Sequence, residues 1–420
     1  MKKEIVTVEF FKEAKEIESE IISNYRSLHK IPETGFALNK TAAYVKCRLD
    51  EMGIEHSECG ENGIVALIGN KRAHGCILLR ADMDALPIRE ETNVGFKSEN
   101  GAMHACGHDA HTAMLLGAAK ILKKHESELV GCVKLVFQPA EELLEGAKNM
   151  IDSGVLENPK ADAAVMLHVI VGTELKSGSV IISSGGVSAP SADYFQINVK
   201  GRGCHGSTPD KGRDPLAVAC RIATALDEIK AKELSISEKA VITVGCLIAG
   251  NTPNVIPDSA VIKGSMRAFD EDTRRYIKER IGKIVSGIAG AFETEGVIDF
   301  YSGAPSLLND ERLSGAVEAL ANATLSPDLV KTSAELNREA ERNGRKSEGA
   351  GSEDFAYISR KVPSVMIGIA AGSRNDGYTY PLHHPKVIFD EKAFVNGSAL
   401  LAKIGAKLPN TSEENHQNNE

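Results

Sequence analysis

Apolar residues near the start of the chain recur with helical spacing. Between Ile5 and His29 most of them fall three to five positions apart, which predicts one amphipathic helix that ends before Pro32. The same kind of pattern predicts helices over residues 41–52 and 112–124. Each of these helices would turn its apolar side towards a hydrophobic core.

Short continuous apolar runs alternate with the helical segments. They cover residues 63–69, 76–81, 132–137, 163–167 and 365–369. Strands that are apolar on both faces belong to sheets that are covered on both sides, as parallel sheets are. The alternation therefore predicts an α/β domain built on a mostly parallel sheet.

The pattern changes near Val187. From Asp193 to Tyr301, strands with alternating apolar and polar residues and two helices follow one another in the order βαββαβ. This order is that of a ferredoxin-like α+β unit. Because α/β elements return after about residue 305, we expect the unit to be inserted into the first domain. The expected parts are 1–186 and 303–408 for the α/β domain, 187–302 for the inserted domain, and 409–420 for a disordered polar tail.

The composition is that of a soluble globular protein. A chain of 420 residues with 42% apolar and 25% charged residues is long for one core and predicts two domains. The net charge of −9, without a block of Lys or Arg, argues against nucleic acid and anionic membranes as partners. With no leader-like or long apolar segment, and eight cysteines that form no C-x-x-C pair, we expect a cytoplasmic protein whose thiols are mostly reduced.

One segment is dense in metal-binding groups. Residues 103–111 contain one thiol, three imidazoles and one carboxylate, a combination for which hydrophobic packing has no use. Cys106 and His108 are two positions apart, which suits ligands that converge from a loop, and a helix would open at His111. The alternative is a polar loop in front of a helix, with a packed cysteine.

Other candidate ligands follow predicted strands at their carboxyl ends, the edge where open α/β sheets bind ligands. They are Asp82, Asp84, Glu141, Glu142 and His168, and near the C-terminus His383 and His384 add two more imidazoles. Several such segments at one edge predict a hydrolase site with two metal ions.

The adjacent Glu141 and Glu142 predict a division of labour. Neighbouring side chains cannot easily bind the same ion, whereas one can bind metal while the other acts as general base towards the attacking water. A charged start of the following helix is the alternative. Taken alone, His168 would more often be a hydrogen-bonded core histidine, and the pair His383-His384 a surface turn.

Several motifs carry a resemblance to a known family. They are Arg80 to Pro87, Met103 to Thr112, Gln138 to Glu142, Gly203 to Pro215, Asn254 to Asp258 and Ser352 to Phe355. Together they resemble the hippurate hydrolase and auxin-conjugate (indole-acetyl-amino acid) hydrolase branch of the aminoacylase-type dinuclear metallopeptidases, from about Ile21 to about Leu401. The resemblance implies hydrolysis of the amide bond of N-acyl or N-aroyl amino acids with two divalent metal ions, manganese or zinc ahead of cobalt or nickel. It also implies a homodimer formed through the inserted domain, which acts as a lid.

The same resemblance implies a role for each ligand candidate. Cys106 would bridge the two ions as a thiolate, a soft ligand that tolerates two borderline cations. The two ion sites would consist of His108 with His168 and of Glu142 with His383, with His384 as the alternative to His383.

Three further carboxylates surround these ligands in the implied site. Glu141 would be the general base that takes a proton from the attacking water. Asp84 would orient a ligand histidine through a hydrogen bond, whereas a role for Asp82 stays open.

In the inserted domain, the resemblance implies contacts with the substrate. His205 would reach the partner subunit's active site and stabilise the oxyanion. Asn254 and Arg267 match positions that meet the substrate carboxylate, although a structural role for Arg267 is an equal alternative. Many relatives carry other residues where this chain has Gly206, Ser207 and Asp210, so substrate contacts there stay open.

The sequence therefore predicts a metal-dependent amidohydrolase that acts on a small N-acyl amino acid. Within enzymes, the alternative is a metallo-dipeptidase or carboxypeptidase that acts on a dipeptide. An alternative of another class is a ligand-binding module without catalysis on the same fold. Glu141 distinguishes these classes, because a binding module needs no general base.

Overall fold

The computed structural model describes residues 9–71, 75–344 and 351–410. These residues form two compact units, each with its own core. The first unit contains the N-terminal part up to residue 186 and most of the chain after residue 307, and the second contains residues 187–307 together with the short segment 351–356. In the described residues no helix is long and apolar enough to cross a membrane.

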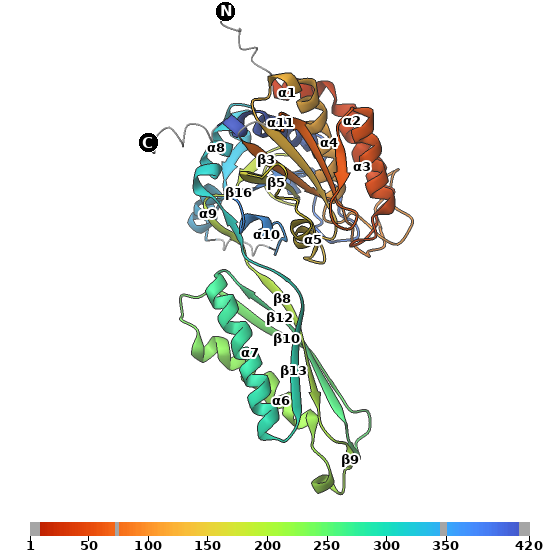
Figure 1. The fold of residues 1–420 in the computed structure, drawn as a ribbon, viewed down its shortest axis with the longest axis vertical. Coiled ribbons are helices and arrows are strands. Elements are labelled where there is room, and N and C mark those ends of the chain that lie inside the picture. Colours follow the sequence, from red (N-terminus) through yellow and green to blue (C-terminus); the bar gives the residue numbers. More distant parts are fainter. Residues whose placement is uncertain (1–8, 72–74, 345–350, 411–420) are drawn as a thin grey trace, which may run out of the picture. The chain divides into compact units, whose positions relative to one another are not determined.

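The first unit is built on an eight-stranded sheet (Figure 1). In order across the sheet, the strands are β1 (His56–Glu58), β2 (Ile64–Gly69), β4 (Cys132–Gln138), β3 (Cys76–Asp82), β5 (Ala163–Ile170), β16 (Ser364–Ala370), β6 (Val180–Ile182) and β15 (Val330–Thr332). The central strands β4, β3, β5 and β16 all run in parallel, and antiparallel pairs occur at β1/β2, β2/β4 and β16/β6. The prediction of a mostly parallel sheet is thus confirmed. Every residue of β3 and β4 is buried, as continuous apolar strands require.

Helices cover this sheet. They are α1 (Phe10–Glu16), α2 (Glu18–His29), α3 (Asn39–Glu51), α4 (His108–Lys124), α5 (Gly146–Asp152), α8 (Glu311–Asn322), α9 (Ser333–Arg342), α10 (Ala356–Ser359) and α11 (Ala393–Lys407). The two most buried helices, α4 and α11, pack against each other and against β3, and α1 and α2 pack onto them. This arrangement fixes the N-terminal end of α4 beside the carboxyl ends of the central strands.

Three predictions on the helices and the tail need correction. The single helix expected from Ile5 to His29 is two helices, because the backbone bends at Ile17 (φ −105°, ψ 13°), where the sequence contains no glycine or proline. Residues 5–8 lie outside the described part. The helix expected from residue 112 begins earlier, at His108. The expected tail begins with a short 3₁₀ turn over Leu408–Asn410, and residues 411–420 lie outside the described part.

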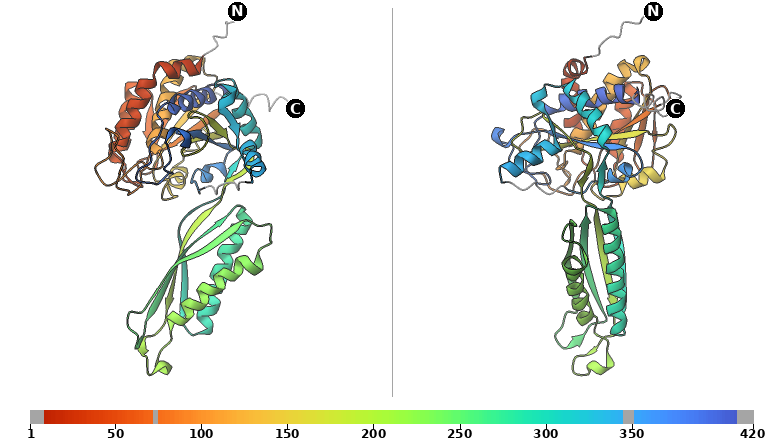
Figure 2. Two further views of the ribbon diagram at one scale, coloured as in Figure 1. Left: turned by 180° about the vertical axis from the view of Figure 1, so that it is seen from behind. Right: turned by 90° about the vertical axis from the view of Figure 1, so that its left-hand side faces the viewer.

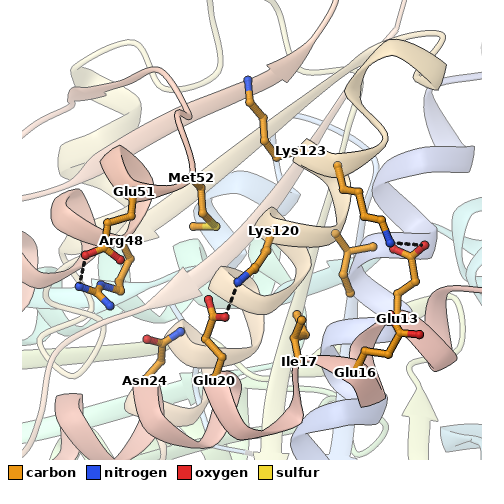
Figure 3. A pocket seen from close by; sticks show the side chains of 12 residues that line it. Glu13, Glu16, Ile17, Glu20, Asn24, Arg48, Glu51, Met52, Lys120 and Lys123 are labelled. Carbon is orange, nitrogen blue, oxygen red and sulfur yellow. Dashed lines mark hydrogen bonds and ion pairs between the residues drawn. The ribbon is translucent and has the colours of Figure 1, made fainter.

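The bend at Ile17 adjoins a groove of about 650 Å³ between α1, α2, α3 and α4 (Figure 3). Oppositely charged side chains of its wall form ion pairs: Lys120 with Glu20, Lys124 with Glu13, and Arg48 with Glu51. Because Lys120 is twelve residues further along α4 than His108, the groove lies about 18 Å along the helix from that histidine. The groove is therefore separate from the predicted metal ligands.

The second unit has the predicted order βαββαβ. Its elements are β8 (Ala192–Lys200), α6 (Pro215–Glu228), β10 (Ala240–Ala249), β12 (Ser259–Ala268), α7 (Glu271–Ala291) and β13 (Glu295–Ala304). The strands form one antiparallel sheet in the order β10-β12-β8-β13, and α6 and α7 lie together on one of its faces (Figure 2). A short ribbon of β9 (Cys204–His205) and β11 (Val255–Ile256) extends from the unit. The ferredoxin-like prediction is confirmed.

Candidate metal centre

The start of α4 places the first two candidate ligands. Gly107 caps the helix in a left-handed conformation (φ 85°), and a Cβ atom there would lie 2.3 Å from Cγ2 of Val169. Only glycine fits both demands. As a result Cys106 lies in the turn before α4. His108 lies in the first turn of α4, whereas the sequence had suggested a loop.

Two groups of candidate ligands share the thiol of Cys106. We call Cys106, His108 and His168 the histidine triad, and Cys106, Glu142 and His383 the glutamate triad; in each, the donor atoms lie within 4.8 Å of one another. Sγ of Cys106 lies 3.6 Å from Nε2 of His168 and 3.3 Å from Nε2 of His383. Nε2 of His383 also lies 3.5 Å from Oε1 of Glu142. Two metal sites that share one ligand would have this layout.

Buried polar atoms without partners test whether metal ions fit here. Among the described residues, both ring nitrogens of His108 and Oε1 of Glu142 are buried and lack a hydrogen-bond partner. Nδ1 of His108 lies 3.4 Å from Oδ1 of Asp84, but without hydrogen-bond geometry. Leaving a buried polar atom unsatisfied costs about 1–3 kcal/mol. Cations would supply partners for one ring nitrogen of His108 and for Oε1 of Glu142, so the residues fit a metal centre.

The electrostatics of the cluster also suit cations. Burial raises the pKa of Glu142 to about 7, and burial raises the pKa of Cys106 far above that of an ordinary thiol. Burial lowers the pKa of His108, but Asp82 and Cys106 oppose this effect and raise it well above the usual range. The carboxyl group of Glu142 and the thiol of Cys106 would therefore tend to keep their protons unless a cation binds beside them. Metal binding would displace those protons.

Asp84 holds the segment that carries the two glutamates. Its Oδ1 accepts the backbone N–H of Glu141 at 3.0 Å, and its Oδ2 accepts that of Glu142 at 3.1 Å. The segment turns sharply, with positive φ angles at Ala140 and Leu144. Because α5 begins only after this turn, the alternative that the glutamates form a charged helix start is wrong.

The structure separates the two adjacent histidines near the C-terminus. His383 adopts a left-handed backbone (φ 66°), and its backbone N–H donates to the carbonyl of Ala105, which turns the ring towards Cys106. The ring of His384 stacks on Tyr380 at a centroid distance of 4.5 Å. The geometry thus favours His383 as the candidate ligand.

Asp82 and His111 form a third possible metal-binding group with His108. Nδ1 of His111 lies 2.5 Å from Oδ1 of Asp82, and Nε2 of His111 accepts the backbone N–H of Val169 at 2.8 Å. Both ring nitrogens of His111 are occupied, so it has no lone pair to offer a metal. No role for His111 follows from the sequence alone, although its position three residues after His108 places both on one face of a helix.

In the second unit, His205 and Asn254 lie close together. The strand of His205 pairs with β11, and the N–H of Gly206 donates to the carbonyl of Asn254 at 2.8 Å. Nδ1 of His205 accepts the backbone N–H of Ser207 at 3.2 Å. With Nδ1 as the acceptor, Nε2 is the ring nitrogen that carries a proton and can donate to a ligand.

Arg267 lies far from this pair. It occupies the end of β12 opposite to the end that leads from Asn254, and eight residue steps of extended chain, about 27 Å, separate it from Ser259 at the start of that strand. Its Nη1 donates to Oγ of Ser352 at 2.7 Å. Within the second unit, the two residues predicted to meet the substrate carboxylate are thus not brought together.

An α/β sheet with two candidate ligand triads at its carboxyl edge and an interrupting α+β unit is typical of one class of protein, the aminoacylase-type metallopeptidases that the motifs resemble. The comparison with protein families agrees. Residues 78–407 match the model of peptidase family M20/M25/M40, and the chain belongs to this family.

Relatives with known names support the same assignment. The chain is 35% identical to N-acetyl-L-cysteine deacetylase of Bacillus subtilis over 95% of this chain and 90% of that protein. It is 36% identical to hippurate hydrolase of Campylobacter jejuni over 90% of this chain and 94% of that protein. A solved structure, the Bacillus subtilis YXEP protein described as a dinuclear metal binding peptidase, superposes with a TM-score of 0.72 at 30% identity and covers 94% of this chain and 99% of its own. The family resemblance is confirmed.

Proposed function

We propose that the protein is a metal-dependent amidohydrolase that cleaves the amide bond of N-acyl or N-aroyl amino acids. The observation that carries this proposal is the pair of triads that share Cys106 and leave buried atoms of His108 and Glu142 without partners among the described residues. The names of the two relatives, a deacetylase of an N-acetyl amino acid and a hippurate hydrolase, support the substrate class.

The two triads would hold two divalent ions. The thiolate of Cys106 would bridge them, with His108 and His168 on one ion and Glu142 and His383 on the other. When bound, the ions supply Lewis-acid activation of the attacking water and of the amide carbonyl. Imidazole, carboxylate and thiolate ligands suit manganese or zinc, and also cobalt or nickel.

Glu141 would move the proton. It would take a proton from the attacking water as the water oxygen bonds to the carbonyl carbon, and then give it to the amine nitrogen as the C–N bond breaks. Its Oε2 lies 3.9 Å from Nε2 of His108, beside both triads. Asp84 would hold Glu141 in place through its backbone N–H.

His205 would stabilise the oxyanion. The proton on its Nε2, fixed by the Ser207 N–H on Nδ1, makes it a donor of the right kind. Asn254, its neighbour, would contact the substrate, and Arg267 would either meet the substrate carboxylate or brace the second unit through Ser352. We expect the protein to work in the cytoplasm as a homodimer in which the second unit acts as lid and brings His205 to the partner's site.

A substrate screen tests the proposal. Metal-free protein reconstituted with manganese, zinc, cobalt or nickel would be offered acetyl, benzoyl, indole-acetyl and fatty-acyl amino acids beside dipeptides. The matched control is Glu141→Gln loaded with the same metal. Turnover of acylated amino acids by the wild type, lost in the control, is the expected result. Preferential turnover of dipeptides would make the protein a dipeptidase, and binding without turnover would make it a binding module.

A further inference from the structure

One buried histidine beside the metal centre has no place in the proposed chemistry. His111 is 2% exposed, and its ring centroid lies 4.5 Å from that of His168. Both of its nitrogens are engaged within the protein, as described above, so it binds no metal. A fully buried histidine that touches neither metal nor substrate must act, if it acts, through another residue.

The hydrogen bonds of His111 define its tautomer. The backbone N–H of Val169 can only donate, so Nε2 of His111 accepts it and Nδ1 carries the proton that bonds Asp82. Nη1 of Arg80 lies 2.5 Å from the other oxygen of Asp82, so this carboxylate is held from both sides.

His111 bonds Val169 where the sheet offers no partner. The pairing of β3 with β5 ends at Arg80 and Met166, three residues before Val169, whereas the pairing of β16 with β5 continues past it. On the β3 side the N–H of Val169 would be left without a strand partner. Nε2 of His111 therefore takes the place of the missing strand.

The same residue, Val169, also fixes the neighbouring candidate ligand. Nδ1 of His168 lies 2.7 Å from the carbonyl oxygen of Val169, which can only accept. His168 therefore carries its proton on Nδ1, and the lone pair on Nε2 is directed to the side where Sγ of Cys106 lies 3.6 Å away. His111 and His168 thus hold the two backbone polar groups of one residue.

We propose that His111 is a positioning residue that acts through Val169 to aim His168 at its metal ion. The proposal rests on the function proposed above, in which His168 is a ligand. In this proposal the bond between His111 and Val169 supports the ligand on β5, whereas Asp82, held by Arg80, sets the tautomer of His111. Partners that orient a ligand from behind typically contribute 10- to 100-fold to metal affinity.

Two substitutions divide the two hydrogen bonds of His111. The side-chain oxygen of His111→Gln can stand where Nε2 stands and accept the Val169 N–H, while the bond to Asp82 is lost. The side-chain NH₂ of His111→Asn can stand where Nδ1 stands and donate to Asp82, while Val169 is out of reach. If His111 acts through Val169, the bond to the Val169 N–H is the one that matters. If His111 is only a structural anchor, the bond to Asp82 is the one that matters.

The measurements are the affinity for each of two metal ions, by competition with a chromophoric chelator, and the visible spectrum of the cobalt-loaded protein. We expect His111→Asn to weaken one ion 10- to 100-fold and to change the cobalt spectrum, and His111→Gln to stay within a few-fold of wild type. Unfolding of the metal-free variants shows whether either substitution disturbs the fold. Equal losses in both variants, or a larger loss in His111→Gln, would overturn the proposal.

His168→Ala separates this proposal from the function on which it rests. If His168→Ala still binds two ions with wild-type affinity, the assignment of His168 as a ligand is wrong and the proposed function must be revised. If His168→Ala loses one ion while His111→Asn loses none, the ligand assignment stands and only the positioning role of His111 is wrong.

Discussion

Histidines occupy opposite environments in two regions of the molecule. The first is the metal edge, the carboxyl edge of the large sheet with the two triads, and the second is the β9 end of the second unit, which carries His205 and Asn254. His108 is buried, and Asp84 approaches it at 3.4 Å from behind. His205 is exposed, and its ring nitrogen Nδ1 lies within hydrogen-bonding distance of Oγ of Ser207, two residues away in the same turn. The ring of His108 is surrounded by residues far apart in the sequence, whereas the ring of His205 contacts its own turn and only its backbone pairs with the distant strand β11.

This difference separates two kinds of preparation for catalysis. At the metal edge, buried groups are held before any ligand arrives, and a low dielectric strengthens every interaction between them. An exposed donor such as His205 competes with water, so it contributes to an oxyanion only after water has been excluded. Substitutions at the metal edge should therefore reduce metal binding. Substitutions at the β9 end should reduce turnover while the metal is retained.

The largest effect is expected at the shared thiol. Cys106→Ser replaces the one atom common to both triads, so both ions should bind more weakly and turnover should vanish, as it should on chelation. Elemental analysis and activity of the reconstituted variant provide the measurement. Cys220→Ser, which changes an exposed thiol, is the control. Unchanged metal content and rate in Cys106→Ser would contradict the shared-ligand arrangement.

The two glutamates should divide the metal edge into binding and proton transfer. Glu141→Gln should keep both ions and lose about 100- to 10,000-fold in turnover, because a general base is gone. Glu142→Gln should lose affinity for one ion, since its Oε1 lies 3.5 Å from Nε2 of His383. Metal titration beside kinetics distinguishes them. If Glu141→Gln loses metal and Glu142→Gln keeps it, the two roles are exchanged.

The β9 end should respond in the opposite way. His205→Ala should reduce turnover about 100- to 1,000-fold, the cost of one oxyanion donor, while metal content stays at the wild-type level. Ser207→Ala tests the local support of the ring and should have a smaller effect, because the Ser207 backbone N–H still holds Nδ1.

The proposed action of His205 across a dimer has its own test. Mixed dimers of His205→Ala and Glu141→Gln chains would contain one site with both residues intact, so mixing should restore part of the activity. Native mass spectrometry would verify that subunits exchange. Exchange without any return of activity would place His205 in the site of its own chain or outside the site.

Much of the metal edge could be predicted because its signals are local. Continuous apolar runs predict the buried strands, and parallel strands bring their carboxyl ends to one edge, so Glu141 and Glu142 after β4 and His168 near the end of β5 meet there. The structure accordingly brings Cys106, His108, Glu142, His168 and His383 together. Their roles as ligands stay a prediction until metal is measured.

What the sequence could not predict depends on tertiary contacts. The different orientations of His383 and His384 follow from the left-handed backbone conformation of His383. The turn at Glu141 and Glu142 is stabilised by hydrogen bonds from their backbone N–H groups to Asp84. The bend at Ile17 could not be predicted, because the sequence contains no glycine or proline there. The role of the β9 end is least predictable, because an exposed turn carries no pattern that distinguishes a donor from a solvated histidine.

The smallest effect, on stability instead of catalysis, is expected at His29 and its two buried carboxylate partners. His29 is buried, with Nδ1 2.6 Å from Oδ2 of Asp109 and Nε2 3.2 Å from Oε1 of Glu90. Burial lowers the pKa of His29, but the two carboxylates outweigh it and raise this pKa from 6.5 to about 10. Burial raises the pKa of Glu90, but its hydrogen bonds with His29 and Thr92 lower it from 4.5 to about 2.

These shifts fix the sign of the pH dependence. A raised histidine pKa gives stability that is complete below pH 6.5 and is lost as the pH rises towards 10, and a lowered glutamate pKa gives stability that is lost as the pH falls from 4.5 towards 2. At pH 6, His29→Gln should therefore lower the free energy of unfolding of metal-free protein by about 3–5 kcal/mol. The difference from wild type should shrink between pH 6.5 and 10.

His56→Gln, which removes an exposed contact with Asp50, should cost less than about 1 kcal/mol at every pH. Urea unfolding across this range measures both variants. A His29→Gln stability curve that runs parallel to that of wild type would mean that His29 does not stabilise the fold through Asp109 and Glu90.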